Sequence, residues 1–187
     1  LAKNNEVILC ALNTNQKTKK EDAFKALQPY CKSITFIDIS KYSILINLTK
    51  AFFKRLPMQC GYFYNKKALK KIHNIIEKHK PDILFGQMIR VAEYLRHEKI
   101  KKVIDYQDVL SMGMKRRRDI APFFLKPIFN MEYRRLKKYE RDIFDDFDIK
   151  TIISKQDRDF IDHHKKEDIL IVPNGVDHEY YSPQEQE

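Results

Sequence analysis

The amino-acid sequence predicts an α/β fold, a Rossmann-like parallel sheet flanked by helices. Short apolar segments alternate with helical segments at the spacing of right-handed crossover connections between parallel strands. The chain has 187 residues, of which 43% are hydrophobic and 33% charged, a composition typical of one globular domain. The only glycines are Gly61, Gly86, Gly113 and Gly175, so a glycine-rich nucleotide-binding loop is excluded.

Six segments are predicted as strands because they are short, apolar and bounded by turn residues. In chain order they are 6–12, 33–39, 83–87, 102–108, 148–154 and 169–172. The last contains four consecutive apolar residues, so we expect it to be covered on both faces and to end at Pro173. Asn174 and Gly175 tolerate positive φ, so we expect a sharp turn whose amides face a ligand or a domain junction, with Asp177 beyond it. The alternative is a tight turn without a ligand.

The segments between the strands are predicted as helices from their apolar periodicity and end signals. These segments are 21–29, 41–55, 65–80, 88–97, 110–144 and 154–163. Pro122 and Pro127 are expected to interrupt the long basic segment, and Ser154 with Asp157 forms a capping box at the start of the last one.

Polar residues follow the fourth predicted strand. Ligands of open α/β sheets lie beyond the carboxyl ends of the strands, where Asp105 and Asp108 would lie. Carboxylates there could orient a sugar hydroxyl, hold a metal or act as a base. The simpler alternative is that Asp108 caps the following helix.

A basic run, Lys115, Arg116, Arg117 and Arg118, precedes Phe123 and Phe124. Basic residues beside aromatic ones favour contact with an anionic membrane or with phosphate. The formal net charge of +10 favours polyanionic partners in the same way. The alternative is that the run is only solvated helix surface.

The cysteines are Cys10, Cys31 and Cys60, without a CxxC pair, so neither a disulfide framework nor a metal site is predicted. The adjacent His163 and His164 do not converge on a metal. A reduced, cytoplasmic compartment is the default expectation. No apolar run approaches the roughly 18 residues that span a bilayer.

Several segments together resemble retaining family 4 glycosyltransferases, and most closely the sugar transferases of exopolysaccharide biosynthesis. The resemblance covers nearly the whole chain and is carried by segments 1–9, 55–63, 105–111, 136–140, 147–154, 169–177 and 181–183. The most specific part is Ile169 to Asp177, which reads ILIVPNGVD, followed by Tyr181-Ser-Pro183.

This resemblance implies one half of a GT-B architecture and a hexosyltransferase activity. Such enzymes transfer a sugar from a nucleotide-sugar donor to a saccharide or lipid-linked acceptor with retention, and need no further cofactor. The cleft candidates are Asp105, Gln107 and Asp108, although relatives often have His where this chain has Gln107. Asn174 and Gly175 would lie at the donor side or domain junction, and the basic run beside the acceptor or the inner face of the membrane.

By the family pattern, residues 1–177 are the amino-terminal acceptor-side domain and residues 178–187 begin an interdomain linker. The donor-binding domain and the first strand would lie outside the sequence. Because that strand is central in a doubly wound sheet, we expect unpaired inner edges and marginal stability, or a gap filled by rearrangement or another chain. By itself the chain should not turn over donor.

The alternative from another class is a basic nucleic-acid-binding α/β module. It is disfavoured because no recognition motif is present and the basic residues do not gather into one element. A receiver-like or flavodoxin-like signalling domain would need an acidic cluster after the first strand, where the sequence has Asn13-Thr14-Asn15.

Overall fold

A computed structural model describes residues 2–14 and 19–175. The strands are β1 (Ile8–Asn13), β2 (Ser33–Asp38), β3 (Ile83–Gln87), β4 (Lys101–Asp105), β5 (Ile149–Ile152) and β6 (Leu170–Ile171). The α-helices are α1 (Lys20–Leu27), α2 (Lys41–Phe53), α3 (Met58–Phe63), α4 (Lys66–His79), α5 (Ala92–Leu95), α6 (Leu110–Ile120), α7 (Lys126–Asp142) and α8 (Lys155–Phe160). Single 3-10 turns are η1 (Gln28–Tyr30), η2 (Ile89–Val91), η3 (Phe144–Asp146) and η4 (Lys166–Asp168). The fold is α/β with parallel strands, as the sequence predicts.

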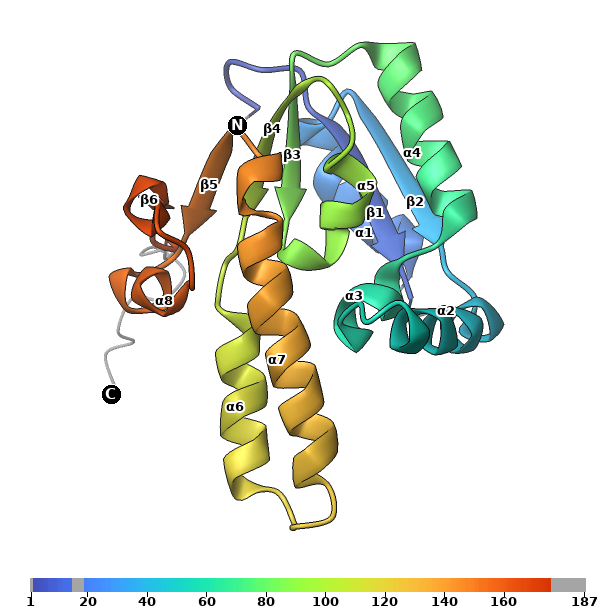
Figure 1. Ribbon diagram of the computed structural model, residues 1–187. Coiled ribbons are helices and arrows are strands. Elements are labelled where there is room, and N and C mark those ends of the chain that lie inside the picture. Colours follow the sequence, from blue (N-terminus) through green and yellow to red (C-terminus); the bar gives the residue numbers. More distant parts are fainter. Residues whose placement is uncertain (1, 15–18, 176–187) are drawn as a thin grey trace, which may run out of the picture.

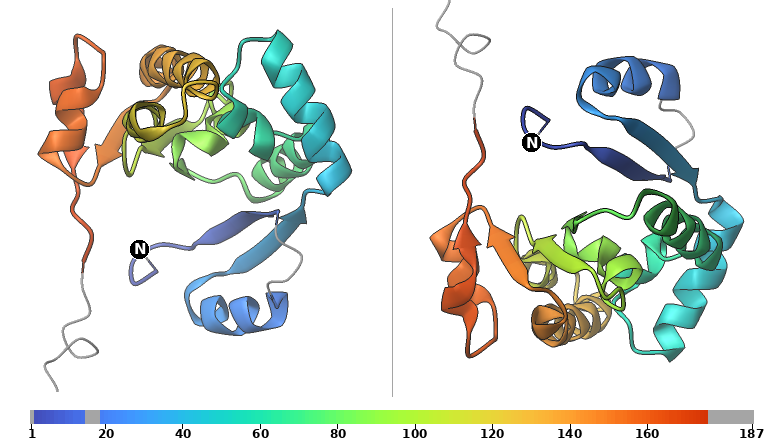
Figure 2. Two further views of the ribbon diagram at one scale, coloured as in Figure 1. Left: turned by 90° about the horizontal axis from the view of Figure 1, so that it is seen from below. Right: turned by 90° about the horizontal axis from the view of Figure 1, so that it is seen from above.

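The strands form two sheets. One has four parallel strands in the order β3-β4-β5-β6, and the other has two, β1-β2, also parallel. The arrows of β1, β2 and β3 point the same way in Figure 1. Figure 2 shows the β1–β2 pair, with α1 on its outer side, apart from the larger sheet. Among the described residues, no strand of one sheet pairs with a strand of the other.

The strand β3 forms an open edge of the larger sheet. Ile83 and Phe85 of β3 have exposed fractions of 52% and 54%, high values for apolar strand residues. The backbone edge of β3 opposite β4 has no strand partner among the described residues. That another strand pairs there stays a prediction.

The core lies around the four-stranded sheet and the helices packed on it. Ile104 of β4, Ile152 of β5 and Leu136 of α7 are completely buried, as are Tyr106 and Phe144. Burying a large apolar side chain stabilises a fold by about 1.5–3 kcal/mol. This core therefore holds β4, β5 and α7 in fixed relative positions, and with them the carboxyl edge of the sheet.

Three local predictions were wrong. The long basic segment is interrupted around Pro122 as predicted, since α6 ends at Ile120, but Pro127 does not contribute to the break. It lies in the first turn of α7, where the backbone N–H that it lacks would have no helical acceptor. Segment 88–97 is η2 followed by the single turn α5 rather than one helix. The last strand is an exposed edge strand: Leu170, Ile171 and Val172 have exposed fractions of 56%, 40% and 54%.

Helix α3 was not predicted, because contacts with distant helices hold it. The Glu132 carboxylate accepts hydrogen bonds from the amides of Met58 at 2.9 Å and Gln59 at 3.1 Å. These bonds cap the amino end of the helix. Gly61 lies so close to α2 that a Cβ there would be 2.4 Å from that of Ala51. Such a close approach permits only glycine.

Candidate functional site

The turn after β4 brings Asp105, Gln107 and Asp108 together at the carboxyl edge of the sheet. Asp105 is half-buried, and its Oδ1 accepts hydrogen bonds from Thr151 Oγ1 at 2.9 Å and the Gln107 amide at 3.2 Å. Gln107 has a φ of 59°, in the left-handed region that side chains with a Cβ disfavour. Asp105 therefore holds the turn that positions Gln107 and Asp108.

Asp108 is the exposed carboxylate of this turn. It does not cap the next helix: α6 starts after Val109, without a side-chain capping bond at its first residue. The simpler alternative for Asp108 is thus not what the structure shows. Of the two predicted carboxylates, Asp108 is the one that a ligand in solution can reach.

Glu140, which the sequence analysis missed, caps α6 instead. Its Oε1 accepts a hydrogen bond from the Ser111 amide at 2.9 Å, and the buried Tyr106 hydroxyl donates to the Glu140 carbonyl at 2.9 Å. Burial raises the pKa of this carboxyl to about 7, and the nearby Asp108 charge adds to that rise. A carboxyl with a raised pKa thus lies close enough to Asp108 to feel its charge.

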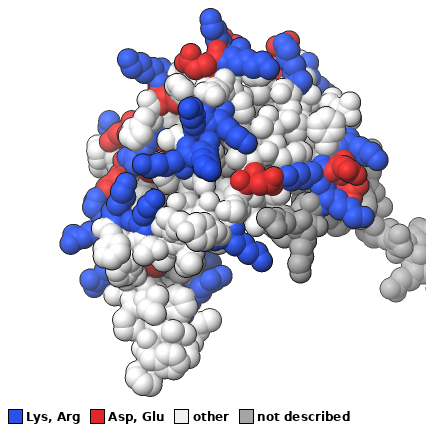
Figure 3. Space-filling view, turned by 90° about the vertical axis from the view of Figure 1, so that its right-hand side faces the viewer, with Lys and Arg blue, Asp and Glu red and all other residues white. Residues whose placement is uncertain are grey.

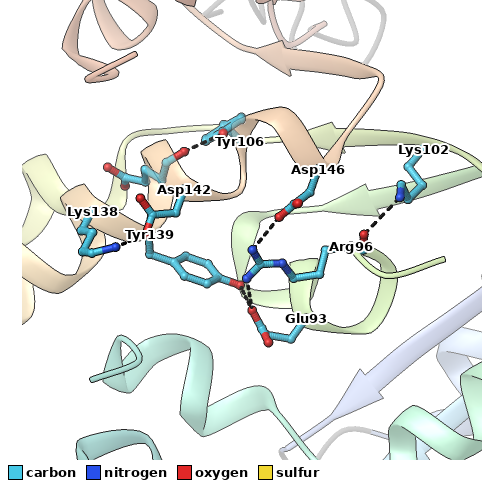
Figure 4. A network of polar contacts seen from close by, with 9 residues as sticks. Glu93, Arg96, Lys102, Tyr106, Lys138, Tyr139, Asp142 and Asp146 are labelled. Atoms are coloured by element: carbon cyan, nitrogen blue, oxygen red, sulfur yellow. Dashed lines mark hydrogen bonds and ion pairs between the residues drawn. The ribbon is translucent and has the colours of Figure 1, made fainter. Parts of the chain in front are cut away.

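A polar network holds α5 against α7 (Figure 4). Glu93 Oε1 accepts from the Tyr139 hydroxyl at 2.9 Å and from Arg96 Nη1 at 2.9 Å. Arg96 also forms an ion pair with Asp146, with 2.6 Å between Nη2 and Oδ2. Burial raises the pKa of Tyr139 well above its usual range, so this hydroxyl stays a proton donor.

An open cavity of about 1060 Å³ lies beside this network. Its walls come mainly from α2, the α2–α3 connection and α7. Eight basic side chains and only two carboxylates line it: Lys50, Lys54, Arg55, Lys66, Arg96, Arg134, Arg135 and Lys138, with Glu93 and Asp142. The sequence alone does not reveal this cavity, because its basic residues belong to segments far apart in the chain.

Helices α6 and α7 form a hairpin that projects from the sheet (Figure 1). Its tip exposes four large apolar side chains, Ile120, Phe123, Phe124 and Ile128, with exposed fractions of 87%, 83%, 63% and 56%. On the face drawn in Figure 3, Lys and Arg are spread over the body of the molecule, and the lowest part shows no charged side chain. The hairpin thus presents an apolar end below a basic body.

The predicted basic run lies on α6, above this tip. Arg118 is committed to the hairpin itself: it pairs with Asp119, donates to Asn130 Oδ1 at 3.0 Å and lies 5.5 Å from the Tyr133 ring centre. Lys115 is half-buried, and Arg116 and Arg117 are exposed. Within the described ranges, these three have no ion pair. The run therefore divides into one structural arginine and three bases available to a partner.

The turn predicted at Asn174 and Gly175 has another form than expected. Both residues are exposed beyond β6, and neither has a positive φ, so the left-handed turn is absent. They lie in an extended segment that leaves the edge of the sheet. Asp177 lies outside the described residues.

Within residues 2–14 and 19–175, no group of three or more His, Cys, Asp or Glu side chains is arranged to hold a metal ion. His163 instead stacks on the Phe144 ring, with 3.8 Å between ring centres. Among the described helices, none combines the length and apolarity needed to cross a bilayer. Comparison with known proteins finds no family model and no curated protein that matches the chain.

Proposed function

We propose that this chain is the acceptor-side domain of a retaining glycosyltransferase. The full enzyme would transfer a sugar from a nucleotide-sugar to a saccharide or lipid-linked acceptor. The observation that carries the proposal is the Asp105–Asp108 turn at the carboxyl edge of a parallel sheet, where ligands of such folds bind. The sequence resemblance supplies the reaction class.

In this proposal Asp108 accepts a hydrogen bond from an acceptor hydroxyl, and Asp105 and Gln107 hold the turn that presents it. A carboxylate suits this role because charge-assisted hydrogen bonds are stronger than neutral ones. Asn174 and Gly175 lie where the chain leaves the sheet, and we assign them to the junction with a donor-binding domain outside these 187 residues. The electrostatic stabilisation of the departing nucleotide would come from that domain.

The test is binding of glycans and of donors to the purified chain. We expect neutral and lipid-linked oligosaccharides on a glycan array to be retained, and nucleotide-sugars to be neither bound nor hydrolysed. Asp108→Asn should weaken glycan binding about tenfold in titration calorimetry, through loss of a charge-assisted bond. Asp82→Asn, an exposed aspartate just before β3 at the opposite edge, should change nothing. Donor hydrolysis by the chain alone, or the absence of any retained glycan, would contradict the proposal.

We also propose a peripheral location at the inner face of the membrane, with the α6–α7 hairpin in contact with anionic lipid. The exposed apolar tip would enter the interfacial region, and Lys115, Arg116 and Arg117 would lie near the headgroups. Each basic residue near an anionic surface contributes about 1 kcal/mol of attraction. A lipid-linked acceptor would explain why an acceptor domain has such a surface.

A further inference from the structure

We infer that the cavity between α2, α3 and α7 is a binding site for a phosphate or diphosphate group. This deepens the proposed function by naming the anionic group of the acceptor, and the binding itself can be measured without assuming any transfer reaction. The volume of about 1060 Å³ matches the upper range of small-molecule sites, enough for a diphosphate together with the group it carries.

The charge balance of the lining is the first argument. Both acidic side chains of the cavity already have basic partners: Glu93 pairs with Arg96, and Asp142 with Lys138. Six bases remain, and within the described ranges none has an ion pair: Lys50, Lys54, Arg55, Lys66, Arg134 and Arg135. Unbalanced positive charge in a concave site attracts anionic ligands and raises their local concentration.

Arg135 provides the second argument. Its Nη2 donates to the Phe52 carbonyl at 3.1 Å, and its guanidinium lies 5.1 Å from the Phe52 ring centre, so the side chain is held in place. Its Nη1 is buried and finds no hydrogen-bond acceptor in the described part of the chain. A buried donor without a partner is unfavourable, and the fork of a guanidinium matches phosphate oxygens. Arg135 also lines the cavity, so its guanidinium is a group that a bound phosphate would contact.

Arg55 provides the third argument and the cleanest test. It has a φ of 57°, directly after the C-cap of α2, where glycine is the favoured residue. An exposed arginine keeps a disfavoured backbone conformation at the rim of the cavity. Replacing it by glycine removes the charge and relieves the backbone at the same time, so a loss of binding cannot be attributed to unfolding.

Titration calorimetry with inorganic diphosphate and inorganic phosphate on the full chain tests the site. We expect saturable binding, with diphosphate tighter than phosphate and both weakened by salt. Arg55→Gly should weaken diphosphate binding at least fivefold without lowering the melting temperature. Arg135→Lys, which keeps the charge but loses the fork, should also weaken it. The matched control is Lys80→Gly: Lys80 also has a left-handed φ, 45°, at the end of α4, but it does not line the cavity.

Several outcomes would overturn the inference. Binding that does not saturate, or an equal loss in the Arg55→Gly and Lys80→Gly variants, would indicate attraction to net charge alone. A DNA duplex that binds more tightly than diphosphate and competes with it at Arg55 would assign the surface to nucleic acid. Diphosphate binding without any glycan binding would support the anion site and contradict the proposed function. Failure of the site and failure of the proposed function can therefore be distinguished.

Discussion

The carboxylate of Glu140, buried on α7, accepts a hydrogen bond from the backbone amide of Ser111 at 2.9 Å and so caps α6 from the neighbouring helix. Glu132, two turns earlier on α7, caps α3 in the same way. One helix thus supplies the acceptors for the free amides at the starts of two others. This arrangement fixes the turn that carries Asp108 and the α2–α3 wall of the cavity with respect to each other.

The Glu140 carboxyl should make the stability of the protein depend on pH. Its pKa is raised to about 7 in the folded state, from an ordinary value of 4.5. The folded protein therefore holds a proton that the unfolded chain has released between these two values. The stabilisation is complete below about pH 4.5 and is lost as the pH rises through 7. The free energy of unfolding should fall by at most on the order of 3 kcal/mol over this range, since each pKa unit corresponds to about 1.4 kcal/mol.

Urea unfolding at several pH values between 4.5 and 8 measures this effect. The wild-type free energy of unfolding should fall through the range, and Glu140→Gln, which keeps an oxygen acceptor for the Ser111 amide but cannot ionise, should remove much of the fall. The exposed Glu77→Gln on α4 is the control and should leave the profile unchanged. Parallel profiles for wild type and Glu140→Gln would show that another group dominates.

Glu132→Ala should destabilise the fold by about 2–3 kcal/mol, because two amides at the start of α3 would lose their acceptors. Glu132→Gln should recover part of this, since it keeps one oxygen acceptor. Chemical unfolding provides the measurement, with the exposed Glu77→Ala as a control expected within about 0.5 kcal/mol of wild type. A Glu132→Ala variant as stable as its control would mean that α3 does not depend on this cap.

The two caps also show what the sequence could and could not predict. Local signals were sufficient where a residue acts within its own segment: Ser154 caps α8 through the Asp157 amide at 3.1 Å, as predicted. Glu132 and Glu140 act on amides at least 29 residues away, and periodicity contains no trace of such a contact. The same holds for the cavity, whose bases come from segments that only the tertiary fold brings together.

The last strand shows a different limit. Its apolar run is genuine, but Leu170 and Ile171 form the edge of the sheet and are partly exposed. A buried central strand and an uncovered edge strand have the same local pattern, because the difference depends on what packs against them. That the open edge of β3 marks the place of a further central strand is an expectation from the family resemblance and stays a prediction.

Two glycines should respond in opposite directions to substitution by alanine. A Cβ at Gly86 in β3 would lie 2.9 Å from Leu95 Cδ1 and 3.1 Å from Ile104 Cδ1, so Gly86→Ala should destabilise by about 1–3 kcal/mol through overpacking. A Cβ at Gly113 in α6 would meet nothing within 4 Å. Gly113→Ala should stabilise the helix by up to about 1 kcal/mol, from helix propensity. Thermal unfolding of both variants measures this, and equal shifts in one direction would contradict the packing described around β3.

Membrane contact through the hairpin makes the last prediction. The double variant Phe123→Ser, Phe124→Ser removes two exposed rings from the tip and should reduce cosedimentation with phosphatidylserine vesicles at least tenfold, because each buried ring contributes roughly 1.5 kcal/mol or more. Arg116→Gln with Arg117→Gln should act differently, lowering binding mainly at low salt, where the electrostatic attraction is strongest. Phe53→Ser is the matched control, since Phe53 is 78% exposed but lies on α2 and not at the tip of the hairpin. Equal losses in the tip and control variants would show that general surface hydrophobicity, rather than the hairpin, drives association. Wild-type binding to neutral phosphatidylcholine vesicles as strong as binding to phosphatidylserine vesicles would remove the requirement for anionic lipid.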